Sequence, residues 1–158
     1  MNKQIALAHF KEEYFELLEE TFERVHGYYL DKETSIFETL NQVSALEASR
    51  HVSKAGGTIA AHTEHMRFYL QVLKEYMLKE RTEKVDWSQS WLLQEVTEEE
   101  WNKLREQLQS TYRSVLQMLR DFEGWDEENG IADPLSILVH SAHHLGEIRQ
   151  MTGAIKAE

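Results

Sequence analysis

Two histidines lie four residues apart in the segment Asp133–Ile155, DPLSILVHSAHHLGEIRQMTGAI. At about 100° per residue, His140 and His144 fall on the same face of a helix. This is the spacing by which one helix presents two imidazole nitrogens to a single metal ion, as HExxH helices do. The pair therefore predicts two ligands of a metal site. Ordinary hydrogen-bonded core histidines are the alternative interpretation.

The helix that carries this pair is predicted to begin at Pro134 and to end near Gly153. Asp133 is a suitable N-cap, and proline is well tolerated at the first helical position. His143 points away from the pair and is predicted to lie at a rim. The buried face is predicted to combine the two histidines with Ile137, Ile148, Met151 and Ile155.

A third ligand has to come from another helix. The flexible stretch Lys54-Ala-Gly-Gly57 is followed by Thr58, a candidate N-cap for a long helix that reaches about Arg81. Both His62 and His65 lie on the inward face of this helix, and periodicity alone does not choose between them. Three neutral imidazoles leave one coordination position open, as in catalytic zinc sites, and such sites also accept nickel or iron.

Two rival metal patterns do not fit the sequence. A ferritin-like di-iron site needs two Glu-x-x-His pairs on different helices, but the chain has one, Glu23-x-x-His26, at a helix end. The zincin motif needs Glu directly after its first histidine, whereas Ser141 follows His140. Neither pattern is therefore predicted for this chain.

The remaining helices must bring the helix that carries His140 and His144 next to the helix that carries His62 and His65. An amphipathic pattern predicts a helix from Lys3 to about His26, with Gly27 as its stop. Ser35 and Glu38 can form a capping box, which predicts a short peripheral helix over residues 36–50.

A second capping box, Thr97-x-x-Glu100, predicts a long helix that Gly124 ends. Residues 82–96 form the loop before it, with Trp87 and Trp91. We expect this loop to pack on the helices or to shape the mouth of the site, because exposed indoles are costly.

Composition indicates one all-α domain over residues 1–158. The chain of 158 residues holds one proline and seven glycines, no cysteine, and a formal net charge of −11. No segment resembles a strand, a signal sequence or a membrane span, so we expect a cytoplasmic protein. The acidic balance predicts that neither nucleic acid nor an anionic membrane is a partner. Four long helices and one short one favour a four-helix bundle.

Two segments resemble those of a known family. His140-Ser-Ala-His-His144-Leu-Gly-Glu147-Ile-Arg is similar to the closing His-x-x-x-His-x-Gly-(Gln/Glu) segment of the DinB/YfiT-like superfamily. Residues 58–70 look like its earlier ligand helix, in which the histidine precedes a hydrophobic residue. His65-Met66 matches that pattern better than His62-Thr63 does. The resemblance implies an up-up-down-down four-helix bundle in which His65, His140 and His144 hold a divalent metal, commonly zinc or nickel.

The resemblance also implies a reaction class. Members of the family are similar to S-transferases and isomerases that use low-molecular-weight thiols such as bacillithiol or mycothiol, and others have been described as metal-dependent hydrolases. The resemblance thus implies a small-molecule substrate, a thiol co-substrate or water, and a homodimer. A non-catalytic, stress-associated or ligand-binding helical protein, with a structural metal or none, is the alternative.

Two carboxylates are candidates to support the metal ligands. Glu147, one turn after His144, is predicted to accept an N–H from a ligand imidazole, and Glu64 is the weaker candidate for a similar role. Solvated carboxylates are the alternative for both. Tyr69 and Tyr76 lie on the same face as the histidines and are expected to fill the core.

Overall fold

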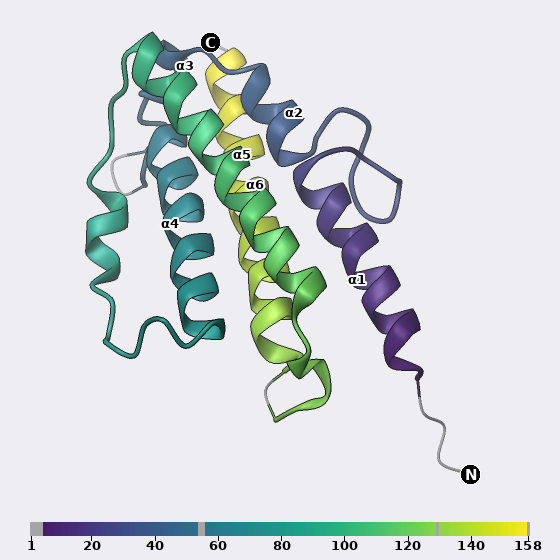
Figure 1. Ribbon diagram of the computed structural model, residues 1–158. Helices are drawn as coiled ribbons and strands as arrows, with labels where there is room; N and C mark the ends of the chain where they lie inside the picture. The colour runs from purple at the N-terminus through teal and green to yellow at the C-terminus, as the bar shows by residue number, and fades with distance from the viewer. Residues whose placement is uncertain (1–4, 54–55, 129, 158) are drawn as a thin grey trace.

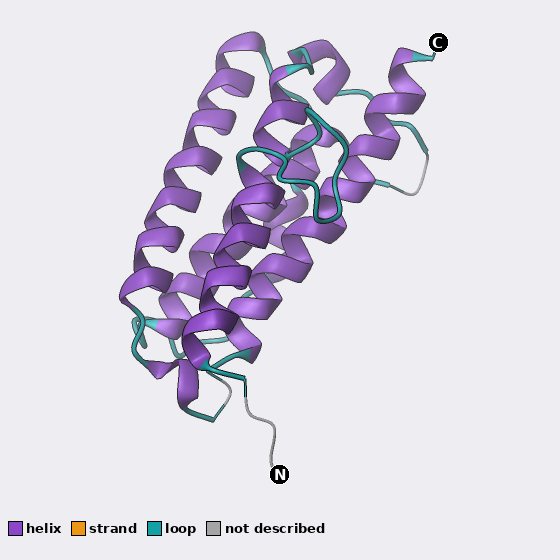
Figure 2. Cartoon of the chain, turned by 90° about the vertical axis from the view of Figure 1, so that its right-hand side faces the viewer, coloured by secondary structure: helices purple, strands orange, loops and turns teal. Residues whose placement is uncertain are grey.

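The computed structural model describes residues 5–53, 56–128 and 130–157, and these contain helices but no strand (Figures 1 and 2). This confirms the predicted all-α class. Lys3, Lys54 and Asn129, which belong to predicted elements, lie outside the described residues. The elements in order are α1 (Leu7–Phe22), α2 (Ile36–Asn41), α3 (Ala45–Ala48), α4 (Ile59–Met77), the 3-10 helix η1 (Trp87–Trp91), α5 (Glu98–Asp121), the 3-10 helix η2 (Gly124–Asp126) and α6 (Ala132–Lys156).

The four long helices α1, α4, α5 and α6 lie side by side, with α4 against both α5 and α6, and α1 against α6. In Figure 1, α1 and α6 run upward, whereas α4 and α5 run downward. The predicted up-up-down-down course is therefore wrong for this chain, whose long helices follow an up-down-down-up order. The pair that carries the histidines, α4 and α6, is antiparallel.

The segment between α4 and α5 explains this order, because it climbs back along the whole of α4 before α5 begins (Figure 1). Its early residues contact the C-terminal end of α4 and its late residues contact the N-terminal end. α5 consequently starts beside the start of α4 and runs parallel to it. Contacts between side chains or backbone groups hold this segment against α4 and its N-cap: Glu83 with Tyr76, Trp87 with Tyr69, Trp91 with His65, and Gln94 with Thr58.

Side-chain caps begin most of the helices, as the sequence predicts. The Thr58 hydroxyl accepts the Ala61 N–H at 3.2 Å at the start of α4, and Thr97 with Glu100 forms a complete capping box at the start of α5. Such caps satisfy N–H groups that have no partner within the helix.

The short helix predicted over residues 36–50 is split into α2 and α3. A capping box that was not predicted from the sequence, in which Ser44 and Glu47 bond reciprocally, begins α3 after α2 ends at Asn41. This stretch is also less peripheral than expected, because Ile36 and Leu40 are almost fully buried. It closes the end of the structure at which α4 and α5 begin.

The first helix ends earlier than predicted, at Phe22 instead of near Gly27. The buried carboxylate of Glu20 accepts the backbone N–H groups of four later residues, His26, Tyr28, Tyr29 and Leu30, at 2.8–3.0 Å. These bonds fold the chain back over α1. Gly27 lies inside the resulting turn with φ of 94°, a conformation that favours glycine.

The bounds of α6 also differ from the prediction. The helix begins at Ala132, so Asp133 lies in its first turn and is not the N-cap. Pro134 is still tolerated there, because the first N–H groups of a helix have no partner within it, and an acidic first turn suits the helix dipole. Gly153 does not end the helix, which continues in regular geometry to Lys156.

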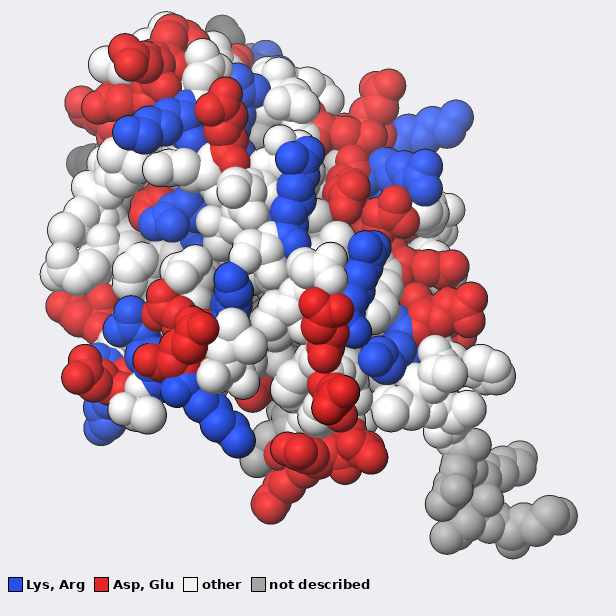
Figure 3. All heavy atoms as spheres, in the orientation of Figure 1, with Lys and Arg blue, Asp and Glu red and all other residues white. Residues whose placement is uncertain are grey.

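Large aromatic side chains fill the interior. Trp101 and Trp125 are both about 1% exposed, and their indole N–H groups donate to the carbonyls of Val43 and Leu119. On the face shown in Figure 3, acidic and basic side chains are interspersed. Within the described residues, every helix is too short or too polar to cross a lipid bilayer.

Candidate metal centre

Three histidines from two antiparallel helices meet in the structure. His65 lies six residues after Ile59, the first residue of α4, and His140 and His144 are about one turn apart on α6. The Nε2 atom of His140 lies 3.1 Å from Nε2 of His65 and 3.2 Å from Nε2 of His144. The residues predicted from the spacing and the resemblance are thus brought together, with one nitrogen of each facing the others.

The separation of these nitrogens fits a common metal ion. Zn–N bonds of about 2.0–2.1 Å at tetrahedral angles place ligand nitrogens about 3.3 Å apart, and octahedral angles place them about 3.0 Å apart. The observed 3.1 and 3.2 Å lie between these values. His65, His140 and His144 could therefore hold a metal ion.

Burial keeps the three imidazoles neutral. It lowers the pKa of His65 and His140 to about 4 and that of His144 to about 2, and the neighbouring imidazoles reinforce the effect. A metal ligand must be deprotonated, so neutral rings with inward lone pairs are suited to bind a cation. A cluster of protonated histidines would instead repel one.

The segment between α4 and α5 orients His65. The Ser90 hydroxyl lies 2.6 Å from Nδ1 of His65 and donates to the Trp87 carbonyl at 2.7 Å. It therefore accepts the His65 Nδ1–H, which leaves Nε2 with its lone pair toward the other histidines. The indole of Trp91 stacks on the same imidazole, with ring centroids 4.2 Å apart.

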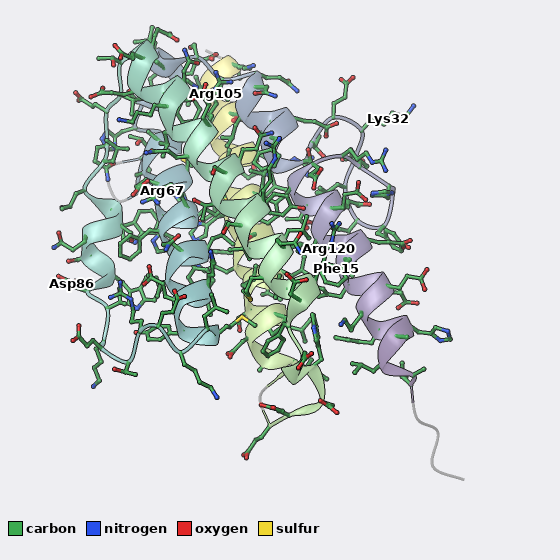
Figure 4. The ribbon with its side chains drawn as sticks, in the orientation of Figure 1. Phe15, Lys32, Arg67, Asp86, Arg105 and Arg120 are labelled. Carbon is green, nitrogen blue, oxygen red and sulfur yellow. The ribbon has the colours of Figure 1, made fainter. Side chains whose placement is uncertain are left out.

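A cap at the start of η1 and a glycine beside Trp91 position the residues that contact His65. Asp86 accepts the Ser88 N–H at the start of η1, the helix that carries Ser90 (Figure 4). Gly57 gives Trp91 room, because a Cβ there would lie 3.3 Å from the indole. The predicted loop is therefore part of the site, and its two tryptophans flank the histidines.

His140 is held by stacking. The ring of Tyr69 lies parallel to its imidazole, with centroids 3.6 Å apart and 7° between the planes. The Nδ1 atom of His140 is buried with no hydrogen-bond partner among the described residues. Tyr69 thus contacts a candidate ligand directly and is half-buried, whereas the sequence predicted only a core-filling role.

Glu147 lies beside the opposite edge of His144. Its Oε2 atom is 3.1 Å from Nδ1 of His144 and 3.3 Å from Nδ1 of His62. The carboxylate is therefore placed to accept the N–H of His144, as expected for Glu147, and this would fix the tautomer that presents Nε2 to the cluster. Glu64 instead accepts two hydrogen bonds of 2.7 Å from Arg67, which Figure 4 labels, and no contact joins it to a histidine ring among the described residues, so its predicted role is wrong.

His62 does not join the three Nε2 atoms but contacts the cluster from outside. Its Nδ1 lies 2.9 Å from Nδ1 of His144, and its ring packs edge-on against Trp91. The structure therefore separates the two candidates on α4, since His65 faces both His140 and His144 through Nε2. Both side chains are buried, which explains why periodicity could not distinguish them.

A pocket of about 560 Å³ opens next to this cluster. Its lining includes His62, Glu147, Gly57, Gly146 and Met151. Its size suits a small molecule. The exposed His143, predicted to lie at the rim, lines the pocket as well.

Sequence reasoning missed two parts of this site, the Ser90 hydroxyl and the stacked ring of Tyr69. Neither belongs to a spacing motif, although the Trp-Ser-Gln-Ser-Trp stretch, residues 87–91, is an unusual composition for a loop.

Comparisons with models of protein families, with curated proteins and with solved structures find no match for this chain. The chemistry of the site therefore rests on the geometry of its own residues.

Proposed function

We propose that this protein is a metal-dependent enzyme of the DinB/YfiT-like type, built on a four-helix bundle with short additional helices. In the proposal, His65, His140 and His144 hold one divalent ion, with zinc or nickel as the leading candidates and iron as a third. The ion acts on a small molecule together with a low-molecular-weight thiol, such as bacillithiol, or with water. The observation that carries the proposal is the convergence of three Nε2 atoms, from the buried His65 and His144 and the half-buried His140, next to an open pocket.

The donor set supports a catalytic role. Three histidines with no fourth ligand among the described residues on the Nε2 side would leave a position for an exchangeable ligand. A divalent ion there would supply Lewis acidity and favour the anionic form of a thiol or a water molecule. Ser90 and Glu147 would fix the tautomers of His65 and His144, and Tyr69 would restrain His140.

The proposal also covers the setting of the reaction. The chain has no cysteine, so a thiol nucleophile must be a separate molecule. Such thiols stay reduced in the cytoplasm, where we place the enzyme. The neighbouring pocket is of a size to hold the electrophile or the scissile group.

Metal analysis tests the first half of this proposal. We expect freshly purified protein that has never met a chelator to carry one or more divalent ions per chain, and we expect His140→Ala to lose an ion. His9→Ala, on the exposed side of α1, is the matched control and should keep the full content. Protein without metal, or an unchanged content in His140→Ala, would show that the site is not a metal centre.

Turnover tests the second half. A panel of electrophiles with bacillithiol, glutathione and cysteine, and a panel of esters and amides without thiol, separates the transferase from the hydrolase. We expect activity in one panel that disappears on chelation and returns with metal. A protein that binds metal and melts lower without it, yet turns over neither panel, would instead be the non-catalytic alternative.

A further inference from the structure

Three donor atoms converge on the side of His144 that faces away from the first cluster. They are Nδ1 of His62, Nδ1 of His144 and Oε2 of Glu147. The two nitrogens are 2.9 Å apart, and the carboxylate oxygen lies 3.3 Å from His62 and 3.1 Å from His144. These distances of 2.9–3.3 Å bracket the 3.1 and 3.2 Å of the first cluster, so this second group could also hold a divalent ion.

The second group differs from the first in its access and in its charge. It faces the 560 Å³ pocket through His62 and Glu147, whereas His65 and His140 are not among the residues that line the pocket. It also includes a carboxylate, which compensates part of the charge of a cation. The exposed His143 brings its Nε2 to 3.4 Å from the same carboxylate oxygen.

We propose that His144 is shared between two metal ions, with the first ion on its Nε2 and a second ion on its Nδ1, completed by His62 and Glu147. This inference rests on the proposed function for the first ion. When the second ion binds, it replaces the proton on Nδ1 of His144, and that proton passes to solvent. His144 then bridges the two ions as an imidazolate. Zinc and copper(II) are the ions whose ligand preferences suit histidine with carboxylate.

The second ion, which shares His144 with the first, would give the pocket a preference for one class of ligand. A cation held by His62 and Glu147 lies at the pocket wall and would anchor an anionic group, such as a carboxylate or thiolate, of the small molecule bound there. The substrate class inferred for this pocket is thus a small anion.

Zinc stoichiometry tests the arrangement through four variants and one control. Metal-free protein is loaded with excess zinc alone, desalted and analysed for zinc per chain. We expect two ions in the wild type and in the control His9→Ala, one in His62→Ala, one in His140→Ala and none in His144→Ala. Glu147→Gln is the second variant for the pocket-side ion and should also hold one. Circular dichroism shows whether each variant is folded.

Copper(II) tests the shared bridge without reference to activity. With two copper(II) ions per chain, we expect a weakened electron paramagnetic resonance signal, because the unpaired electrons couple across a bridging imidazolate. His62→Ala with one copper should give its full signal.

Each of the other outcomes overturns a defined part of the proposal. One zinc in the wild type that His140→Ala and His144→Ala lose, but that His62→Ala and Glu147→Gln keep, leaves the first site standing and refutes the second. Two ions with two independent copper signals refute the shared imidazolate. No zinc in the wild type refutes the proposed function as well.

Discussion

Glu20 offers the most direct test of how a single side chain holds the turn that packs over α1. Its carboxylate is fully buried and accepts four backbone N–H groups. Burial by itself opposes ionisation, but these bonds outweigh it and lower the pKa of Glu20 from 4.5 to about 2. A shift of this size corresponds to about 3 kcal/mol of stability at neutral pH.

We expect Glu20→Gln to lower the free energy of unfolding at pH 7 by about 2–3 kcal/mol. The amide keeps one oxygen acceptor but turns an N–H₂ group toward two backbone N–H donors, which then lack a partner. The lower end of the range allows for the N–H groups of His26 and Tyr28, whose residues are partly open to water. Urea denaturation at 25 °C measures the difference by linear extrapolation.

The pH dependence gives the sign of the effect. The folded-state pKa is depressed, so this stability is present above pH 4.5 and is lost as the pH falls toward about 2. The difference between wild type and Glu20→Gln should therefore shrink over this window. Glu13→Gln is the control, because it makes the same change at an exposed position of α1 and should stay within about 0.5 kcal/mol. Equal effects of the two variants at pH 7, or a Glu20→Gln difference that persists at pH 2, would refute the reasoning.

Three further predictions concern the site and the turns near it. Ser90→Ala removes the 2.6 Å contact to His65 and should weaken zinc affinity by about 10–100-fold, measured against a competing chelator; unchanged affinity would contradict the role of the hydroxyl. Removal of metal with EDTA should lower the Tm by about 5–10 °C, if the ion is present at about 100 times its Kd. The Tm of His144→Ala should not respond, and an equal shift there would point to an unspecific effect. Gly130→Ala should lower the free energy of unfolding by at least about 2 kcal/mol, because its Cβ would overlap a backbone carbonyl of η2. Gly153→Ala, whose Cβ would meet nothing within 4 Å, should instead stabilise α6 by up to about 1 kcal/mol. Urea denaturation measures both variants, and similar effects of the two would be inconsistent with these contacts.

The sequence by itself determined the features that depend on neighbours along the chain. Thr58 and the pair Thr97 and Glu100 cap α4 and α5 as predicted, because a cap bonds backbone groups only two or three residues away. The same locality placed His140 and His144 on one face of α6. A capping box at Ser44 was visible by the same rule, although the longer helix pattern hid it.

Only the tertiary structure decided the features that depend on contacts between distant segments. Glu20 ends α1 early through bonds to residues six to ten positions later, and no helix pattern contains that signal. The parallel course of α4 and α5 follows from contacts along the whole connecting segment, such as the bond between Thr58 and Gln94. Helix periodicity could not reveal either.

The metal centre combines both kinds of information. Spacing selected His140 and His144, but the choice of His65 for the Nε2 cluster depends on how α4 is rotated against α6. That rotation places His62 at the other nitrogen of His144, where it meets Glu147. An imidazole has two nitrogens on different edges of its ring, and only the packing of the helices decides which partner each edge receives.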